Sequence, residues 1–239
     1  MLNFRNTRFV FALAVFVLIS YDFSHDVPQW IYFLLVFVYC SLIFFGSYFI
    51  QSNFFLKAFC GGNENKNEIA ITFDDGPHEN TNAILDVLKE YRAKAGFFCI
   101  GKNISGREAI VKRISDGGHI VSNHSFSHSN FFDFFSVKKL DEDVSKTDEL
   151  IFKITGKRNK LFRPPFGVTT PNIGRLVNRK DYNVIGWNLR SKAESFSMYL
   201  WYSEIVVAPI QVMSPRPNAG FIRLAASEAP SVLPAPISV

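Results

Sequence analysis

The stretch Ile69-Ala-Ile-Thr-Phe-Asp-Asp-Gly-Pro77 decides the fold of this chain. It begins with residues that favour β-structure and ends in a Gly-Pro pair that forces a turn. We therefore expect the carboxylates of Asp74 and Asp75 at the C-terminal end of a strand. Adjacent like charges repel each other, and solvent, a shared proton or a cation relieves that repulsion. We interpret the pair as part of a metal site, and the alternative is an ordinary strand-ending turn.

Two histidines at ligand spacing follow in the segment His124-Ser-Phe-Ser-His128. One turn of helix places residues i and i+4 on the same face, so we expect the two imidazoles to converge. With one carboxylate they supply three ligands and leave a position for water, as in catalytic zinc sites. The alternative is a pair of histidines on a helix face that binds no ligand.

The chain resembles the polysaccharide deacetylases in three motifs, which are Thr72-Phe-Asp-Asp-Gly-Pro77, His124-Ser-Phe-Ser-His128 and Arg163-Pro-Pro-Phe-Gly167. The resemblance covers about residues 66–190. It implies a metal-dependent hydrolase that removes N- or O-acetyl groups from peptidoglycan, chitooligosaccharide or xylan. Removal of an N-acetyl group breaks a carbon–nitrogen bond that is not a peptide bond.

The resemblance also implies a role for each charged residue in these motifs. Asp75 is the metal ligand beside His124 and His128, and Asp74 is the catalytic base that takes a proton from the attacking water. Arg163 pairs with Asp74 through its planar fork and holds it ionised and correctly aimed. The alternative for Arg163 is a surface charge before a proline-rich loop.

Three further residues are expected around the substrate. The resemblance assigns the backbone N–H of Phe166 to the oxyanion, in a loop that Pro165 stiffens, and we expect Trp187 to line the pocket or to pack beneath it. Two imidazoles and a carboxylate suit Zn²⁺, although Co²⁺ or Ni²⁺ fits the same ligands. The cofactor is therefore predicted to be a divalent metal, with zinc preferred.

Strand and helix signals alternate through the middle of the chain. Strands are predicted at 69–73, 96–100, 119–122, 161–163 and 182–187, and helices at 80–92, 107–115, 137–154 and 172–178. Repeated βα units favour a parallel sheet, and polar motifs at successive strand ends favour a barrel over an open sheet. The resemblance implies an α/β fold of this kind: an incomplete, distorted (β/α) barrel with its site at the C-terminal mouth of the strands.

The chain divides into four regions by composition. Residues 1–53 form a membrane region with helices at 9–21 and 30–50, and 54–67 form a polar linker. Residues 68–192 form the catalytic domain, which we expect to be C-terminally incomplete, and 193–239 form an atypical proline-rich tail. The net charge of +5 includes no basic run, so a nucleic-acid partner is not expected. Nothing in the composition indicates an oligomeric state.

The membrane region does not decide on which side of the bilayer the catalytic domain lies. Residues 30–50 carry no charge and are long enough to cross a bilayer, so we predict a multi-pass or single-pass membrane protein in contact with lipid. Arg5 and Arg8 place the N-terminus inside, and two crossings then return the domain to the cytoplasm, whereas one crossing leaves it outside. The alternative is a pair of buried helices in a soluble protein.

The C-terminal part departs from the family pattern. No histidine follows His128, so the histidine that protonates the leaving amine in the family is absent from its expected place. Glu194 is a poor match to the family's aspartate after Trp187, and six of the eleven prolines fall between Pro209 and Pro236. We expect a largely irregular tail, in which the apolar runs at 198–202 and 205–208 form at most one strand or short helix. We also expect an exposed sheet edge where the missing strands of a complete barrel belong.

Three functions remain open at this point. The first is a membrane-anchored, metal-dependent deacetylase of an acetylated glycan. The second is a catalytically impaired remnant that keeps the metal and binds glycan without the general acid. The third is a membrane protein whose soluble part is only structural.

Overall fold

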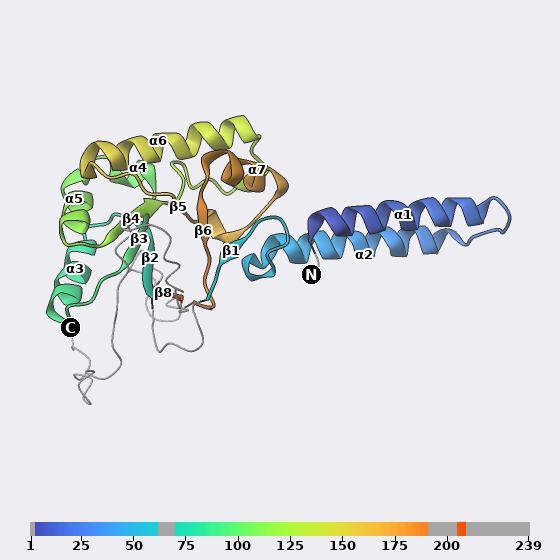
Figure 1. Ribbon diagram of the computed structural model, residues 1–239, viewed down its shortest axis with the longest axis horizontal. Helices are drawn as coiled ribbons and strands as arrows, with labels where there is room; N and C mark the ends of the chain where they lie inside the picture. The colour runs from blue at the N-terminus through green and yellow to red at the C-terminus, as the bar shows by residue number, and fades with distance from the viewer. Residues whose placement is uncertain (1–2, 62–69, 191–204, 209–239) are drawn as a thin grey trace, which may run out of the picture.

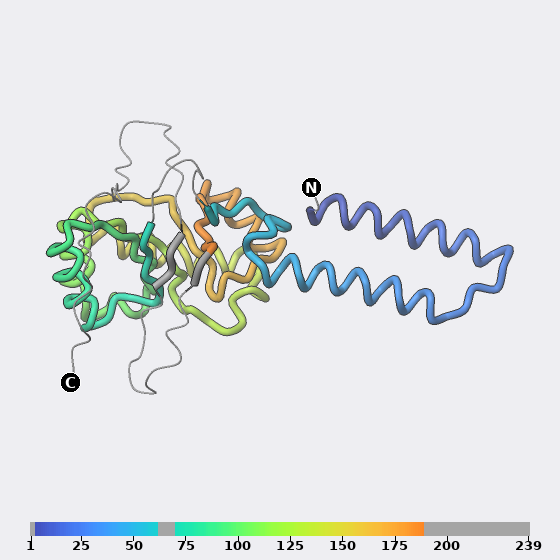
Figure 2. Tube along the Cα trace, turned by 90° about the horizontal axis from the view of Figure 1, so that it is seen from below, coloured from blue at the N-terminus to red at the C-terminus, as the bar shows by residue number. Residues whose placement is uncertain are grey.

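The computed structural model describes residues 3–61, 70–190 and 205–208. A pair of long helices projects from one side of a domain in which helices surround a sheet (Figure 1). The pair consists of α1 (Phe4–Asp22) and α2 (Gln29–Tyr48). The first helix is longer at both ends than the expected 9–21, whereas the second begins one residue before the expected 30–50 and ends two residues before its expected end. The two lie side by side in both views (Figure 2).

The sheet follows the order β1-β6-β5-β4-β3-β2-β8-β7. All pairings from β1 to β2 are parallel, and β8 pairs antiparallel with β2 and with β7. The parallel strands are β1 (Ala58–Phe59), β2 (Ala70–Gly76), β3 (Gly96–Cys99), β4 (Ile120–Asn123), β5 (Leu161–Phe162) and β6 (Asn183–Ile185). The added strands are β7 (Leu189–Arg190) and β8 (Ile205–Ala208). The predicted parallel α/β architecture is confirmed, as a curled, incomplete barrel.

Helices cover the outer face of this sheet (Figure 1). They are α3 (Thr81–Glu90), the short α4 (Gly101–Ile104), α5 (Glu108–Asp116), α6 (Val137–Thr155) and α7 (Pro171–Lys180), with 3-10 turns at Ile50–Ser52, Phe132–Phe134 and Pro165–Gly167. Capping residues set the ends of α6: the Ser136 side chain accepts from the N–H of Lys139, and Gly156 closes the helix at φ 68°. Sequence periodicity predicted four of these helices and missed α4, which has only four residues.

Two apolar clusters form the core of the domain. The first lies between α3, α5 and strands β2 to β4 and includes Leu85, Phe97 and Val111. The second lies between α6, α7 and strands β5 and β6 and includes Leu140 and Phe162. Both clusters fix the strands from which the site residues emerge.

Residues 54–61 are not a free linker, although the composition suggested one. Phe54 and Ala58 are buried, and β1 pairs with β6 at the edge of the sheet. Ile50, just after α2, is 2% exposed and belongs to the second core cluster. The end of α2 is therefore part of the domain, and the rest of the expected linker, 62–67, lies outside the described residues.

The expected exposed edge of the sheet is also corrected. Residues 205–208 form the strand that the sequence allowed there, and β8 pairs with β2 from Ala70 to Phe73. The tail thus supplies a partner for the strand that carries Asp74 and Asp75. Glu194 and the rest of the proline-rich tail lie outside the described residues.

Candidate metal centre

The predicted site residues follow the C-terminal ends of parallel strands. Asp74 and Asp75 lie near the C-terminal end of β2. His124 follows β4, Arg163 follows β5 and Trp187 follows β6. Because these ends meet at one edge of a parallel sheet, the residues come together although they are far apart in the sequence. This edge is the mouth of the incomplete barrel.

Asp75 and the two histidines converge on one point. Asp75 Oδ1 lies 3.4 Å from His124 Nε2 and 3.3 Å from His128 Nε2. One ligand atom from each of the three residues lies within 4.8 Å of the others. These separations are close to those between ligands that share one tetrahedral metal ion.

A loop, not a helix turn, brings the histidines together. Residues 124–128 have no helical structure, and Ser125 and His128 adopt positive φ angles of 68° and 44°. Asp75 (φ 65°) and Phe166 (φ 59°) share this left-handed backbone conformation. Such angles are unfavourable for residues other than glycine, and their concentration here is typical of a functional site.

Side-chain oxygens hold this loop in place. Asn123 Oδ1 accepts from the N–H of Ser125 (2.8 Å), and Ser125 Oγ accepts from the N–H of His128 (3.0 Å). Asp143, on α6, accepts from the N–H groups of Phe126 (2.6 Å) and Ser127 (3.2 Å). Four consecutive backbone N–H groups are thus bonded to side chains, which fixes the direction of His128.

The surroundings shift the pKa values of the two histidines in opposite directions. Burial lowers the pKa of His124. The hydrogen bond to Asp75 and the charges of Asp74 and Asp75 together outweigh this effect, so the pKa lies above its ordinary value. Burial and the neighbouring His124 lower the pKa of His128 to about 4 although Asp75 opposes them, so His128 is neutral near pH 7. Nδ1 of His124 lies 2.8 Å from the carbonyl oxygen of Arg163, which directs Nε2 toward Asp75.

The donor set therefore fits a cation. When Nδ1 of neutral His124 donates to Arg163, Nε2 presents a lone pair to the Asp75 carboxylate, and two acceptors face each other. A proton or a metal ion reconciles them, and metal binding displaces the proton. Two imidazole nitrogens and one carboxylate oxygen are ligands of catalytic zinc sites.

Arg163 is fully buried beside this centre. Its Nη1 donates to Asp74 Oδ1 at 2.5 Å and to Thr72 Oγ1 at 3.0 Å, and Asp74 itself is 5% exposed. Its Nε and Nη2 donate to the carbonyl oxygens of Ile185 and Gly186. The guanidinium thus connects β2 to the end of β6 and fixes the Asp74 carboxylate next to the three candidate metal ligands.

The remaining predicted residues line the same region. Phe166 is half exposed, and its ring lies 4.7 Å from that of His128. Pro165 is buried at the start of the turn that contains Phe166. Trp187 lies with its ring 5.7 Å from the Arg163 guanidinium, and it fills the space next to Gly167.

Asp143 was not among the residues predicted for the site, and Asn123 had no predicted role. Asp143 falls on the buried stripe of α6 between Leu140, Val144 and Thr147, so an acidic residue at a core position was the available signal. Asn123 donates to Asp148 Oδ1 at 2.7 Å as well as accepting from Ser125. Both residues bond to the backbone of the histidine loop.

Known proteins resemble this chain in the region of the site. A family model described as polysaccharide deacetylase matches residues 61–185. A peptidoglycan-N-acetylglucosamine deacetylase of Bacillus cereus is 37% identical over 134 residues, which are 54% of this chain and 46% of the relative. The peptidoglycan-N-acetylmuramic acid deacetylase PdaA of Bacillus subtilis is 36% identical over 55% of this chain and 51% of the relative. The chain therefore spans about half the length of these curated relatives.

Solved structures agree with the sequence matches. The structure of Bacillus subtilis PdaA, a family 4 carbohydrate esterase, has a TM-score of 0.52 and 34% identity and covers 55% of this chain and 57% of that one. A family 4 pseudoenzyme from Bacillus anthracis has a TM-score of 0.50 and 26% identity and covers 54% of this chain and 46% of that one. The same fold thus occurs in a deacetylase and in a protein described as a pseudoenzyme.

Proposed function

The chain belongs to the polysaccharide deacetylase family, and from this premise we propose that it is a metal-dependent hydrolase that removes acetyl groups from an N-acetylated glycan of the peptidoglycan or chitooligosaccharide type. One observation carries the proposal. Asp75 Oδ1 lies within 3.4 Å of both histidine Nε2 atoms, beside a second carboxylate that Arg163 fixes in place. A purely structural role gives no reason to gather these groups at the mouth of the barrel.

The roles of the residues follow from their positions. Asp75, His124 and His128 would hold a divalent metal, which would supply Lewis-acid polarisation of the acetyl carbonyl. Asp74 takes the proton from the attacking water, because its carboxylate is adjacent to Asp75 and is aimed by Arg163. The half-exposed Phe166 presents its backbone N–H in the loop where the oxyanion develops.

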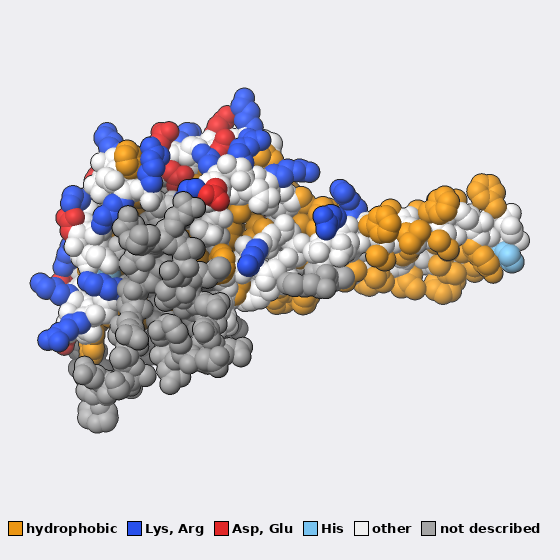
Figure 3. Space-filling model, viewed as in Figure 1, with side chains coloured by type: hydrophobic (Ala, Val, Ile, Leu, Met, Phe, Trp, Pro, Cys, Tyr) orange, Lys and Arg blue, Asp and Glu red, His pale blue; other side chains and the backbone are white. Residues whose placement is uncertain are grey.

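We propose zinc as the metal and α1 and α2 as membrane spans. Zinc prefers two imidazoles with a carboxylate and an open position. Both helices are long and apolar enough to cross a bilayer, and only 6% of each apolar segment is buried. Apolar side chains cover the projecting pair (Figure 3), with Phe33 74% and Phe37 70% exposed. Buried helices of a soluble protein do not leave such side chains in water.

One feature of the sequence favours a second candidate function. No histidine follows His128 in the printed sequence, although a group must protonate the leaving amine. The second candidate is a protein that binds metal and acetylated glycan without turning it over. Loss of an acid catalyst lowers a rate by about a hundred- to ten-thousand-fold, so the two candidates differ in measurable turnover.

Acetate release by the full-length protein in detergent tests the function. We expect zinc to bind, and acetate to be released from N-acetylglucosamine oligomers or peptidoglycan fragments. Asp74→Asn is expected to keep zinc binding and to lower acetate release by about a hundredfold or more, because the amide keeps an oxygen acceptor for Arg163 but does not take a proton from water. Asp75→Asn is the matched variant that is expected to lose zinc as well.

The outcomes separate the candidates. Zinc binding without acetate release from any of these substrates supports the glycan-binding candidate. Absence of zinc binding that depends on His124 and His128 contradicts both. Acetate release that Asp74→Asn leaves unchanged contradicts the assigned base.

A further inference from the structure

The paired apolar helices return the chain to the domain from which they project. α1 and α2 run antiparallel, with the rings of Phe11 and Tyr39 stacked at 4.0 Å between centroids. Asp22 closes the far end, where its two oxygens accept from the N–H of Val27 and the hydroxyl of Tyr32. A hairpin of this kind places both of its open ends on one side of a bilayer.

Both open ends are bonded to the domain. At the start of α1, the N–H of Phe4 donates to the carbonyl oxygen of Phe54 at 3.0 Å. At the end of α2, Ser47 Oγ donates to the carbonyl oxygen of Thr169 at 2.8 Å, and the N–H of Thr169 donates back to Ser47 at 3.0 Å. The beginning of α1 and the end of α2 both meet the domain (Figures 1 and 2). When both helices cross a bilayer, the domain lies on the same side as the beginning of α1.

The same contacts place the metal centre close to the end of α2. Gln51 donates from its side-chain amide to the carbonyl oxygen of Trp187 at 2.9 Å. Thr169 is three residues after Phe166, whose ring contacts His128, and three residues span at most about 11 Å. Since the 20 residues of α2 are about 30 Å long and match the hydrocarbon core, their last turn lies at the lipid surface. The mouth of the site is then at that surface as well.

The distribution of charge selects the side. Arg5, Arg8 and Lys57 flank the domain end of the hairpin, and no lysine or arginine lies between residues 9 and 56. The far turn carries the acidic Asp22 and Asp26 together with His25, and it has no lysine or arginine. Because short flanks rich in lysine and arginine stay in the cytoplasm, this bias puts the turn outside and the domain inside.

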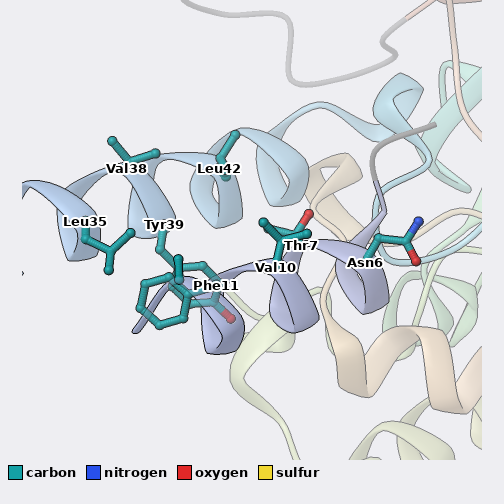
Figure 4. A pocket seen from close by; sticks show the side chains of 9 residues that line it. Asn6, Thr7, Val10, Phe11, Leu35, Val38, Tyr39 and Leu42 are labelled. Atoms are coloured by element: carbon teal, nitrogen blue, oxygen red, sulfur yellow. The ribbon is translucent and has the colours of Figure 1, made fainter. Parts of the chain in front are cut away.

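A groove between the helices leads toward the domain. It encloses about 410 Å³, and Figure 4 shows Val10 and Phe11 of α1 and Leu35 and Tyr39 of α2 around it. Thr7 lies at its domain end, with a hydroxyl that is buried and has no hydrogen-bond partner among the described residues. Leu42, also in its lining, is about 7.5 Å along the helix axis from Ser47, which is bonded to the site loop.

We infer that the domain works on the cytoplasmic face of the membrane and that its substrate is an N-acetylated sugar carried on a membrane lipid, whose chain enters the α1–α2 groove. The inference rests on the proposed deacetylase function and narrows its substrate. A site held at the lipid surface meets sugars that are attached to lipids, whereas an assembled polymer outside the membrane is out of reach from the cytoplasm.

Labelling of cysteine variants in intact cells tests on which side of the membrane the domain lies, without measuring activity. Ser24→Cys lies in the exposed far turn, and Glu149→Cys lies on the exposed face of α6. We expect a membrane-impermeant maleimide to label Ser24→Cys in intact cells and Glu149→Cys only after lysis, with the unsubstituted protein as background. Labelling of Glu149→Cys before lysis, or failure of Ser24→Cys to label in intact cells, overturns the inference.

Acetate release in lipid nanodiscs tests the substrate. The full-length protein is given an N-acetylglucosamine disaccharide linked to a polyisoprenyl diphosphate, or the same disaccharide free in solution. We expect the lipid-linked form to react at least about tenfold faster at equal concentration, because the shared membrane raises its effective concentration at the site. Equal rates overturn the inference and leave the deacetylase function intact, and failure of both substrates removes that function and the inference with it.

Two matched substitutions distinguish the contribution of the groove to substrate preference from the contribution of membrane attachment alone. Ala14→Phe fills the groove, whereas Leu13→Phe adds the same ring next to it on a lipid-facing position. We expect Ala14→Phe to abolish the preference for the lipid-linked substrate with the rate on the free disaccharide unchanged, and Leu13→Phe to preserve it. Equal preference in both variants overturns the assignment of the groove.

Discussion

Asp143 Oδ1 lies 2.6 Å from the backbone nitrogen of Phe126, so that a carboxylate on α6 holds the loop between the two histidines that we propose as metal ligands. The same carboxylate accepts from the N–H of Ser127 at 3.2 Å and is 9% exposed. The loop needs such support because Ser125 and His128 both adopt positive φ angles. Asp143 is therefore a positioning residue for His128.

Removal of this carboxylate is expected to weaken metal binding. Asp143→Ala leaves two partly buried N–H groups without their acceptor and frees His128 to turn away, so we expect zinc affinity to fall by about 10- to 100-fold. Asp143→Asn keeps one acceptor oxygen and is expected to recover most of the affinity. Competition with a chromophoric chelator measures both values.

A neighbouring residue supplies the control for this prediction. Glu142 is exposed on the same helix, so Glu142→Ala changes a carboxylate without touching the loop. We expect its zinc affinity and its thermal unfolding to match those of the original protein. An Asp143→Ala variant that binds zinc as tightly as Glu142→Ala contradicts the positioning role.

The convergence of the site residues could be predicted from the sequence, whereas the path of this loop could not. Asp75, His124 and Arg163 each follow a strand of a parallel sheet, and strand ends meet at one edge whatever the connections do. The path from His124 to His128 was predicted wrongly as a helix turn, because its conformation depends on Asp143 and on positive φ angles. Neither a long-range hydrogen bond nor a left-handed serine has a local sequence signal.

Replacement of Arg163 by lysine is expected to lower both stability and activity. Its three nitrogens donate to Asp74, Thr72, Ile185 and Gly186, and a single ammonium group cannot reproduce this fork. Each buried acceptor that loses its donor costs about 1–3 kcal/mol, so Arg163→Lys is expected to lower the free energy of unfolding by at least that amount. We also expect kcat to fall with little change in KM, since Asp74 loses its orientation.

Arg175 on α7 provides the matched control. Its guanidinium is exposed and donates to Asn172 of the same helix at 2.8 Å. Arg175→Lys should therefore leave thermal unfolding and acetate release unchanged. If Arg163→Lys behaves like Arg175→Lys in both measurements, the fork is not what holds Asp74.

Gly167 is expected to be required for stability for two reasons, which are its backbone conformation and its contact with Trp187. Its φ is 70°, and an added Cβ lies 2.2 Å from the Cη2 atom of Trp187. Gly167→Ala should combine backbone strain of about 1–2 kcal/mol with displacement of the indole. Gly106→Ala has a similar φ of 78° and no atom within 4 Å of the new Cβ, so it measures the strain alone.

Two measurements distinguish the contributions. Thermal unfolding is expected to show a larger loss of stability for Gly167→Ala than for Gly106→Ala. A shift in tryptophan emission should appear only in Gly167→Ala, because Trp187 moves in that variant alone. Equal stability losses and equal spectra would show that Trp187 does not pack on Gly167.

The base of the hairpin shows where composition misleads. Residues 54–61 precede a run of asparagine, glutamate and lysine and were expected to be a linker, yet they contain β1 and the buried Phe54. A strand of two residues has no periodicity to detect, and its partner β6 lies more than a hundred residues away. The prediction of α/β units succeeded where segments were long and periodic, as in α6, and failed where long-range pairing alone defines the element.

His119 is expected to make stability depend on pH. The imidazole is 9% exposed, and its Nδ1 accepts from the N–H of Ala95 at 3.2 Å. Burial, together with the charge of Lys94, lowers the pKa of His119 from 6.5 to about 4. The folded protein therefore keeps a neutral imidazole at pH values where the unfolded chain already binds a proton.

The direction of the effect follows from this difference. The contribution of neutral His119 to stability is complete above about pH 6.5 and is lost as the pH falls toward about 4, up to about 3 kcal/mol in total. His119→Gln keeps an acceptor for Ala95 and does not titrate, so its stability should fall less over the same interval. Thermal unfolding of the metal-free protein in detergent from about pH 7 to about pH 4 measures both curves. Because the lowered pKa of His128 acts in both proteins, only the difference between the curves reports on His119, and parallel curves would contradict the prediction.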